Sequence, residues 1–88
     1  MAGDRLPDLV ALFDRFDPIE LIRGGAPLGE YEPEARTILP RLSDPTSPAD
    51  VQRIVFEEFT RWFGTESAGA IEDYESVAGA VWDWHRRS

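Results

Sequence analysis

The sequence contains no cysteine, no lysine, no asparagine and only one histidine. Without cysteine it has no disulfide, no thiolate nucleophile and no cysteine-based zinc or iron–sulfur site. Without lysine it has neither a Schiff-base amine nor the lysine of a phosphate-binding loop. A single histidine excludes most histidine-based metal sites, so we expect neither a metal nor a cofactor.

Positive charge and long apolar runs are also scarce. All nine basic residues are arginines, against 17 Asp and Glu, which gives a net charge of −8. Phosphate groups are bound by basic side chains, so we expect neither a nucleic acid nor an anionic membrane as a partner. No apolar run approaches the roughly 20 residues of a membrane span, and residues 1–5 lack the apolar stretch of a signal peptide. We therefore expect a soluble, cytoplasmic protein, and the arginine-only bias suggests a GC-rich bacterial genome.

The residues that are present suit one helical domain spanning residues 1–88. Apolar residues make up 42% of the chain and include five Phe, three Trp and two Tyr, enough for one core. They recur at helical spacing, whereas alternating strand patterns and hairpin signals do not occur. The expected helices span about residues 7–16, 18–23, 33–39 with a turn to 42, 48–63, and from after 65 or 67 to 87. The predicted fold is all-α, a compact bundle of four main helices plus one short helix.

Local signals support these helix boundaries. Asp17 and Pro18 are typical of a helix start, as are Ser47 and Pro48 with Asp50 three residues after the serine. Pro40 should kink or end the third helix, and Gly64 should end the fourth.

The inward faces of the last two helices follow from the same spacing. On the fourth helix the inward stripe is Val51, Ile54, Val55, Phe59, Trp62 and Phe63, and Glu57 and Glu58 should face away. Val55, Phe59 and Trp62 of this stripe should face Tyr74, Val77, Val81 and Trp82 of the last helix, because a short connection makes the two helices antiparallel neighbours. Ile71 should also face inward.

Three features could carry chemistry, but each has a simpler structural interpretation. His85 lies on the apolar side of the last helix, and no nucleophile or orienting group accompanies it, so we expect a half-buried structural histidine. The carboxylates of Glu30, Glu32 and Glu34 lack the spacing of a calcium loop and suit the start of a helix. The glycines between residues 24 and 29 follow a helix rather than a strand, so they indicate a turn rather than a phosphate site.

The acidic residues and one tryptophan are the candidates for binding a protein partner. The antiparallel arrangement should bring the acidic start of the last helix near the acids of the fourth, forming one negative surface. This surface is either a docking face for a basic partner or a solvated face. The candidate residues are Glu30, Glu32, Glu57, Glu58, Glu72, Asp73, Glu75 and Trp84.

A set of residues in the first two thirds of the chain resembles a known family. They are Phe16-Asp17-Pro18-Ile19, Gly25, Tyr31-Glu32-Pro33-Glu34, Ile38, Val51 and Ile54. Their pattern is similar to the YugE-like domain of small helical bacterial proteins, over residues 10–82. The chain departs from that pattern in its Ser47-Pro48 helix start and its long last helix.

The resemblance implies a helical fold and no reaction. Its shared residues have structural interpretations: Asp17 caps a helix, Pro18 sets a turn, Gly25 or Gly29 supplies a positive φ, Tyr31 packs under the loop, and Glu34 supports a helix start. Similar small acidic helical proteins occur as immunity proteins beside bacterial toxins.

Two functional hypotheses remain, and neither is an enzyme. The first is a protein-binding module, such as an immunity or antitoxin-like inhibitor of a basic toxin domain. The alternative is a structural or adaptor subunit, including a homodimer that forms through the last helix. Two features of that helix motivate it: Trp84, and a face of small Ala and Gly residues that would allow close approach by a neighbouring helix.

Overall fold

The computed structural model describes residues 5–43 and 47–87, and it shows an all-α fold that is 76% helical, with four α-helices. No strand occurs among the described residues. There are also two short 3-10 helices among the described residues: η1 continues α2, and η2 precedes α4. The elements are α1 (Leu6–Phe16), α2 (Glu32–Ile38), η1 (Leu39–Ser43), α3 (Pro48–Ala68), η2 (Ile71–Tyr74) and α4 (Glu75–Arg87).

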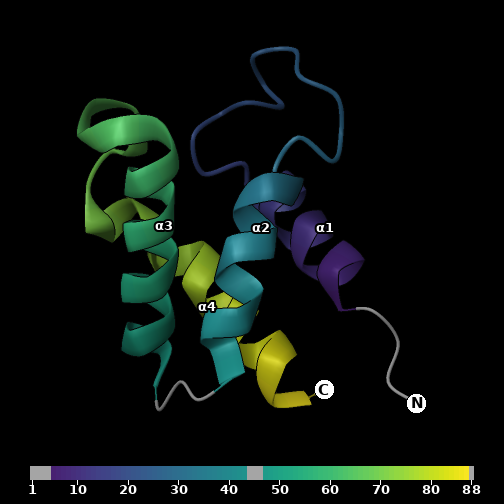
Figure 1. Ribbon diagram of the computed structural model, residues 1–88, viewed down its shortest axis with the longest axis vertical. Coiled ribbons are helices and arrows are strands. Elements are labelled where there is room, and N and C mark those ends of the chain that lie inside the picture. The colour runs from purple at the N-terminus through teal and green to yellow at the C-terminus, as the bar shows by residue number, and fades with distance from the viewer. Residues whose placement is uncertain (1–4, 44–46, 88) are drawn as a thin grey trace.

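The four α-helices form a closed bundle. Both α1 and α3 pack on α2 and on α4. In Figure 1, α2 lies in front, α4 passes behind, and the segment between α1 and α2 forms a loop at the top. The radius of gyration of 12.1 Å matches the about 12 Å expected of a single domain of this length. Among the described residues, no helix is both long enough and apolar enough to cross a membrane.

The expected starts of the first and fourth helices are confirmed. In α1, Pro7 occupies the first turn and Asp8 follows it near the positive end of the helix dipole. At the start of α3, the Ser47 Oγ accepts a hydrogen bond from the Asp50 N–H at 3.2 Å. Pro48 takes the first helical position, where its missing N–H costs nothing.

The expected short helix over residues 18–23 is wrong, because this segment forms turns. Asp17 ends α1 in the left-handed conformation, with φ 50° and ψ 57°. Its carboxylate then accepts hydrogen bonds from the N–H groups of Ile22 and Arg23, at 2.9 and 3.0 Å. These donors lie five and six residues ahead, further than the donors that a helix cap binds. The carboxylate therefore closes a wide loop instead of starting a helix.

The third helix changes type where proline interrupts it, as expected. The α-helical part ends at Ile38, and residues Leu39–Ser43 continue as the 3-10 helix η1. Pro40 lacks the N–H that a further α-helical turn would use. The tighter turn buries Leu42 and leaves Arg41 pointing toward α3.

The last helix starts later than expected. Gly64 interrupts α3 with φ 84°, as expected, but a further helical turn extends the element to Ala68. Gly69 then reverses the chain with φ 80°, η2 follows, and α4 starts only at Glu75. Two side chains hold this turn: the Asp73 carboxylate accepts from the Ala70 N–H at 3.0 Å, and the Tyr74 hydroxyl donates to the Ala68 carbonyl at 2.5 Å.

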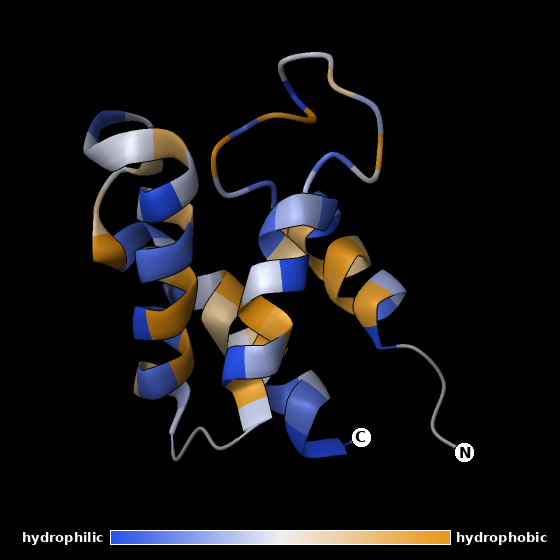
Figure 2. Ribbon diagram, viewed as in Figure 1, coloured by the Kyte–Doolittle hydropathy of each residue, from blue (hydrophilic) through white to orange (hydrophobic). Residues whose placement is uncertain are grey.

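The core is an aromatic cluster surrounded by aliphatic side chains, and the inner helix faces are apolar in Figure 2. Phe59 is fully buried, and its ring lies 5.4 Å from the rings of both Phe13 and Tyr74 and 5.8 Å from that of Tyr31. The expected packing of Phe59 on Tyr74 is therefore confirmed. Trp62 was placed wrongly in this stripe. Its side chain is 47% exposed, and its indole N–H donates to the Thr37 hydroxyl of α2 at 3.1 Å.

Candidate functional site

The candidate acids lie at three separate places instead of on one face. Glu57 and Glu58 lie on the side of α3 that faces η1, where both bind Arg41. The acids of η2 and α4 lie on another side of α3, where Gln52 donates to the Ile71 carbonyl at 2.8 Å. The expected convergence of these two groups is therefore wrong, because the side chains that η2 and η1 contact lie on different faces of α3.

Arginines neutralise the carboxylates of Glu57 and Glu58. Arg41 bridges both, with Nη2 2.7 Å from Glu57 Oε1 and Nη1 2.9 Å from Glu58 Oε2. Arg53 lies 3.6 Å from Glu57, and Arg61 lies 3.5 Å from Glu58. The hydrogen bond from Arg41 lowers the pKa of Glu57 below its usual value. This network ties η1 to α3 and leaves little free negative charge.

Glu58 was expected to face away from the core, and that expectation is wrong. Its side chain is only 3% exposed. Burial of a charged carboxylate is costly unless a cation and hydrogen bonds accompany it, and Arg41 supplies both from another element. The role of Glu58 is therefore structural, and it cannot meet a partner directly.

The acids before and within α2 have mixed environments. Glu32 pairs with Arg36 one turn later, whereas Glu30 is exposed. Glu34 is buried at 4% exposure, and its Oε1 has no hydrogen-bond partner. Burial, together with the charge of Glu30, raises the pKa of Glu34. In the described part of the chain, no group of three or more His, Asp or Glu is arranged to hold a metal ion.

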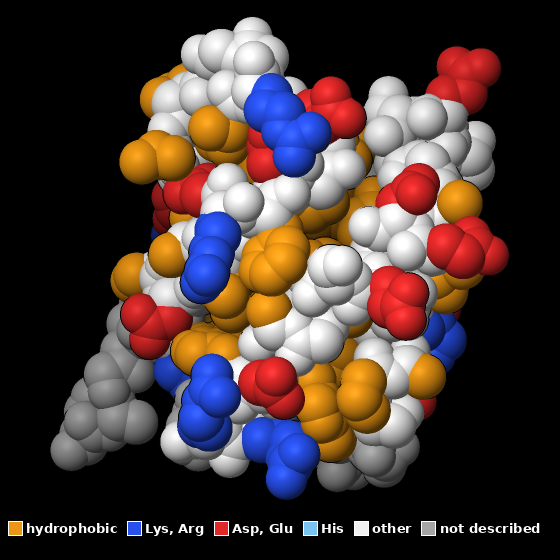
Figure 3. Space-filling model, turned by 180° about the vertical axis from the view of Figure 1, so that it is seen from behind, with side chains coloured by type: hydrophobic (Ala, Val, Ile, Leu, Met, Phe, Trp, Pro, Cys, Tyr) orange, Lys and Arg blue, Asp and Glu red, His pale blue; other side chains and the backbone are white. Residues whose placement is uncertain are grey.

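A free negative surface remains at the turn between α3 and α4. We call it the acidic corner and define it as Ile71, Glu72, Asp73 and Glu75. All four residues are exposed, and within the described ranges no arginine lies within ion-pair distance of the three carboxylates. In Figure 3 acidic side chains gather along this edge of the molecule, at the right of the view. The corner keeps its full charge.

The acidic corner also presents an apolar side chain. Ile71 was expected to pack inward, but it is 37% exposed. Tyr74, at the end of η2, is buried in the core, whereas Ile71, at its start, stays at the surface. Glu66, on the last turn of α3, is exposed as well and adds a further carboxylate before the corner. An exposed isoleucine among uncompensated carboxylates is a surface that suits an apolar and basic ligand.

Trp84 is half-buried and lies against the N-terminal part of the chain. The Arg5 guanidinium lies 4.5 Å from the centroid of the Trp84 ring, a cation–π contact. The same guanidinium donates to His85 Nδ1 at 2.8 Å. Burial and the positive charge of Arg5 lower the pKa of His85. Arg5, the residue before α1, therefore contacts both Trp84 and His85 near the end of α4. Trp84 is less accessible than expected.

A buried Asp17–Tyr31 pair holds the loop between α1 and α2. The Tyr31 hydroxyl donates to Asp17 Oδ1 at 2.6 Å, and both residues are buried. Burial acts to raise the pKa of Asp17, but the hydrogen bonds from Tyr31, Ile22 and Arg23 outweigh it and lower the pKa. Burial and the neighbouring carboxylate raise the pKa of Tyr31 well above its usual value.

The sequence patterns predicted that Asp17 caps a helix and that Tyr31 packs under the loop. They did not predict that the two side chains contact each other. Because the pair is enclosed and its hydrogen bonds are used within the loop, we assign it a structural role.

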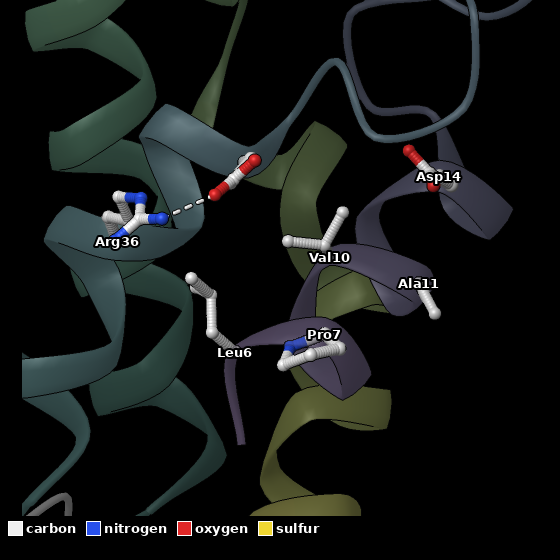
Figure 4. A pocket seen from close by; sticks show the side chains of 7 residues that line it. Leu6, Pro7, Val10, Ala11, Asp14 and Arg36 are labelled. Atoms are coloured by element: carbon white, nitrogen blue, oxygen red, sulfur yellow. Dashed lines mark hydrogen bonds and ion pairs between the residues drawn. The ribbon is translucent and has the colours of Figure 1, made fainter. Parts of the chain in front are cut away.

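An open groove of about 360 Å³ runs between α1 and α2 (Figure 4). Leu6 and Val10 form its apolar floor, and Asp14, Glu32 and Arg36 form its rim. The charges of this rim are already engaged. Asp14 accepts from the Gly29 N–H at 3.0 and 3.2 Å, and Glu32 pairs with Arg36. The groove can take an apolar side chain, but its charges do not select a ligand.

In comparison with known proteins, no family model, no curated protein and no solved structure matches the chain. The resemblance to the YugE-like domain stays a prediction.

Proposed function

We propose that the chain is a non-enzymatic protein-binding module that docks a basic protein surface on its acidic corner. The observation that carries this proposal is the exposed Ile71 within three carboxylates that no arginine of the described chain neutralises. A complementary partner surface presents arginine or lysine around an apolar contact. The cytoplasm is the compartment that we expect for this binding.

Charge and apolar area have different roles in such an interface. Uncompensated carboxylates attract a basic partner over a Debye length of about 10 Å at moderate salt and speed its approach. Ile71 then gives the complex an area that loses water on contact, which contributes about 25 cal/mol per Å² of apolar surface. The other acidic pair, Glu57 and Glu58, cannot replace the corner, because arginines of the same chain already bind both.

The titratable groups with shifted pKa values support a binding role more than a catalytic one. Asp17, Tyr31 and Tyr74 are buried and make hydrogen bonds inside the fold. A general acid or base must reach the proton that it transfers, and these groups face no open site. His85 uses its Nδ1 to accept from Arg5.

A basic toxin domain is one partner with the required chemistry, so an immunity-type inhibitor is the specific form of this proposal. Many toxins that act on nucleic acids have basic clefts, and an acidic corner with a central isoleucine suits the mouth of such a cleft. A salt-dependent association rate would accompany this form of recognition.

The test compares two variants with the same change in net charge. The corner variant is Glu72→Gln with Glu75→Gln, and the control variant is Asp8→Gln with Glu30→Gln, which neutralises two exposed acids elsewhere. The probe is a synthetic amphipathic helix that presents arginines beside a leucine stripe, and calorimetry measures its affinity at several salt concentrations. Circular dichroism confirms that both variants are folded.

We expect the corner variant to lose about tenfold or more in affinity, equivalent to about 1.4 kcal/mol, and the control to lose much less. Equal losses in both variants would show that the probe responds only to net charge, and the proposal would then be wrong. Ile71→Ser should weaken binding at high salt as well, because its contribution is not screened.

A further inference from the structure

The exposed face of α4 carries opposite charges at its two ends. The acidic corner lies at the start of the helix, and Arg86 and Arg87 are exposed at its end. Within the described residues, no carboxylate lies within ion-pair distance of either arginine. Arg86 makes a cation–π contact with the Trp82 ring, with its guanidinium 5.6 Å from the centroid. One helix face therefore presents three free carboxylates at one end and two free arginines at the other, with the exposed carboxylate of Asp83 one turn before the arginines.

The middle of this face contains a glycine, Gly79, and so presents little side-chain bulk there. Val77, Ala78 and Val81 point into the core, and on the opposite side lie Ser76, Gly79 and Asp83. A side chain added at Gly79 would meet nothing within 4 Å, so no contact within the chain requires glycine there. Glycine is unfavourable inside a helix relative to alanine, and it is useful where another backbone approaches closely.

We propose that the acidic corner of one copy binds Arg86 and Arg87 of a second copy, in an antiparallel dimer along α4. This inference rests on the proposed function, because it names a partner for the same corner. If the helices cross between Gly79 and Ala80, Asp73 and Arg86 lie at equal distances from the crossing point. With a rise of 1.5 Å per residue, each lies about 10 Å away from it. The corner of each copy then faces the arginines of the other.

Twofold symmetry makes this arrangement self-complementary. An antiparallel pair repeats the same acid–arginine contact at both ends. Each copy supplies the acids of one contact and the arginines of the other. The contact is small and polar, and the two copies carry like net charge, so the dimer should be weak and reversible. It covers the corner, and a basic partner must displace the second copy to reach it.

The inference is tested by exchanging the charges. The acid-reversed variant is Glu72→Arg with Glu75→Arg, and the arginine-reversed variant is Arg86→Glu with Arg87→Glu. Asp73 is left unchanged because its carboxylate also holds the Ala70 N–H. Sedimentation equilibrium measures the mass of the full chain at concentrations up to about 1 mM, where even an affinity of about 4 kcal/mol is detected. Circular dichroism checks the folding of every variant.

We expect the wild-type chain to form dimers as concentration rises and each variant alone to stay monomeric. An equal mixture of the two variants should dimerise again, because each reversed end then meets its complement. The chain that carries all four changes should dimerise by itself for the same reason. A wild-type chain that is monomeric throughout, or a mixture that fails to restore the dimer, would overturn the inference.

The arginine-reversed variant separates this inference from the proposed function, since its acidic corner is intact. It should lose self-association and still bind the basic amphipathic helix. A monomeric wild-type chain that binds this helix would overturn only the dimer, whereas a dimeric chain whose monomeric arginine-reversed variant ignores the helix would overturn only the proposed docking function.

Discussion

Replacement of Tyr31 by phenylalanine removes the hydroxyl that donates to Asp17 and leaves the ring in place. The lost hydrogen bond is 2.6 Å long and ends on a carboxylate that is 5% exposed. The hydroxyl oxygen also lies 3.4 Å from the N–H groups of Ile19 and Leu21, which lose their acceptor. The ring keeps its packing, with its centroid 5.8 Å from that of Phe59. The change therefore tests the polar contact without creating a cavity.

The cost follows from the charge of the acceptor. A hydrogen bond to a charged group contributes about 1.5–3 kcal/mol, and the two weaker contacts add less than a typical hydrogen bond each. We expect Tyr31→Phe to lower the free energy of unfolding by about 2–3 kcal/mol, out of the about 5–15 kcal/mol of a small domain. The Asp17 carboxylate keeps its hydrogen bonds from Ile22 and Arg23, so the loop weakens but is not lost.

Urea denaturation at several pH values measures this effect. The folded pKa of Asp17 is lowered, so its stabilising contribution is present above its ordinary pKa and is lost as pH falls through the folded value. Without the tyrosine hydroxyl the folded pKa should rise, and acid destabilisation should begin at a higher pH. Tyr74→Phe is the matched control, because the Tyr74 hydroxyl donates to a neutral carbonyl and its loss should cost only about 1 kcal/mol. Equal costs for the two variants would refute the reasoning.

Three further changes test other parts of the fold by urea or thermal denaturation. Arg41→Ala should cost about 3 kcal/mol, because it removes the closest cation from the buried carboxylate of Glu58. Glu34→Gln should stabilise the protein by about 1 kcal/mol near neutral pH, because it removes a buried carboxylate whose Oε1 has no partner. The raised folded pKa of Glu34 makes its contribution favourable below its ordinary pKa and lost as pH rises, so this gain should vanish in acid. Phe59→Ala should cost about 3–5 kcal/mol, since its ring is fully buried among four aromatic rings.

Each of these changes has a control on the surface. Arg36→Ala breaks an exposed ion pair and should cost less than about 1 kcal/mol. Glu30→Gln removes an exposed carboxylate and should alter stability by less than about 0.5 kcal/mol. Trp62→Ala removes a ring that is half exposed, so it should cost clearly less than Phe59→Ala. A control that changes stability as much as its buried counterpart would contradict the assigned burial or pairing.

Helix boundaries were predictable wherever neighbouring residues decide them. The Ser47 cap, the first-turn prolines and the break at Gly64 depend on contacts within a few residues, so their patterns are visible in the sequence. Asp17 and Pro18 show the same pattern as a helix start, yet they form a loop. There the carboxylate accepts from N–H groups beyond the first turn and from Tyr31, 14 residues away, and the local pattern contains no sign of that contact.

The candidate site was predictable in part. The exposed carboxylates of Glu72, Asp73 and Glu75 follow from an acidic segment where one helix gives way to the next. Glu58 was placed outside because of its charge, although it lies seven residues after Val51, on the inward side of the helical pattern. Its burial depends on Arg41, 17 residues earlier, which η1 brings to the same side of α3. Trp62 was misplaced for a similar reason, since its ring meets Thr37 of α2 instead of α4.

The all-α class, the first and fourth helix starts and the acidic character of the chain could all be predicted from the residues in order, because composition, periodicity and capping act over short distances. Which acids stay free depends on how the helices pack. A carboxylate is neutralised where the fold brings an arginine within about 4 Å of it and stays charged elsewhere. Helix packing sets that distance. The packing places Arg41 against Glu57 and Glu58 and places no arginine of the described chain at the acidic corner. The division between a structural ion network and a free docking surface is therefore a property of the folded bundle.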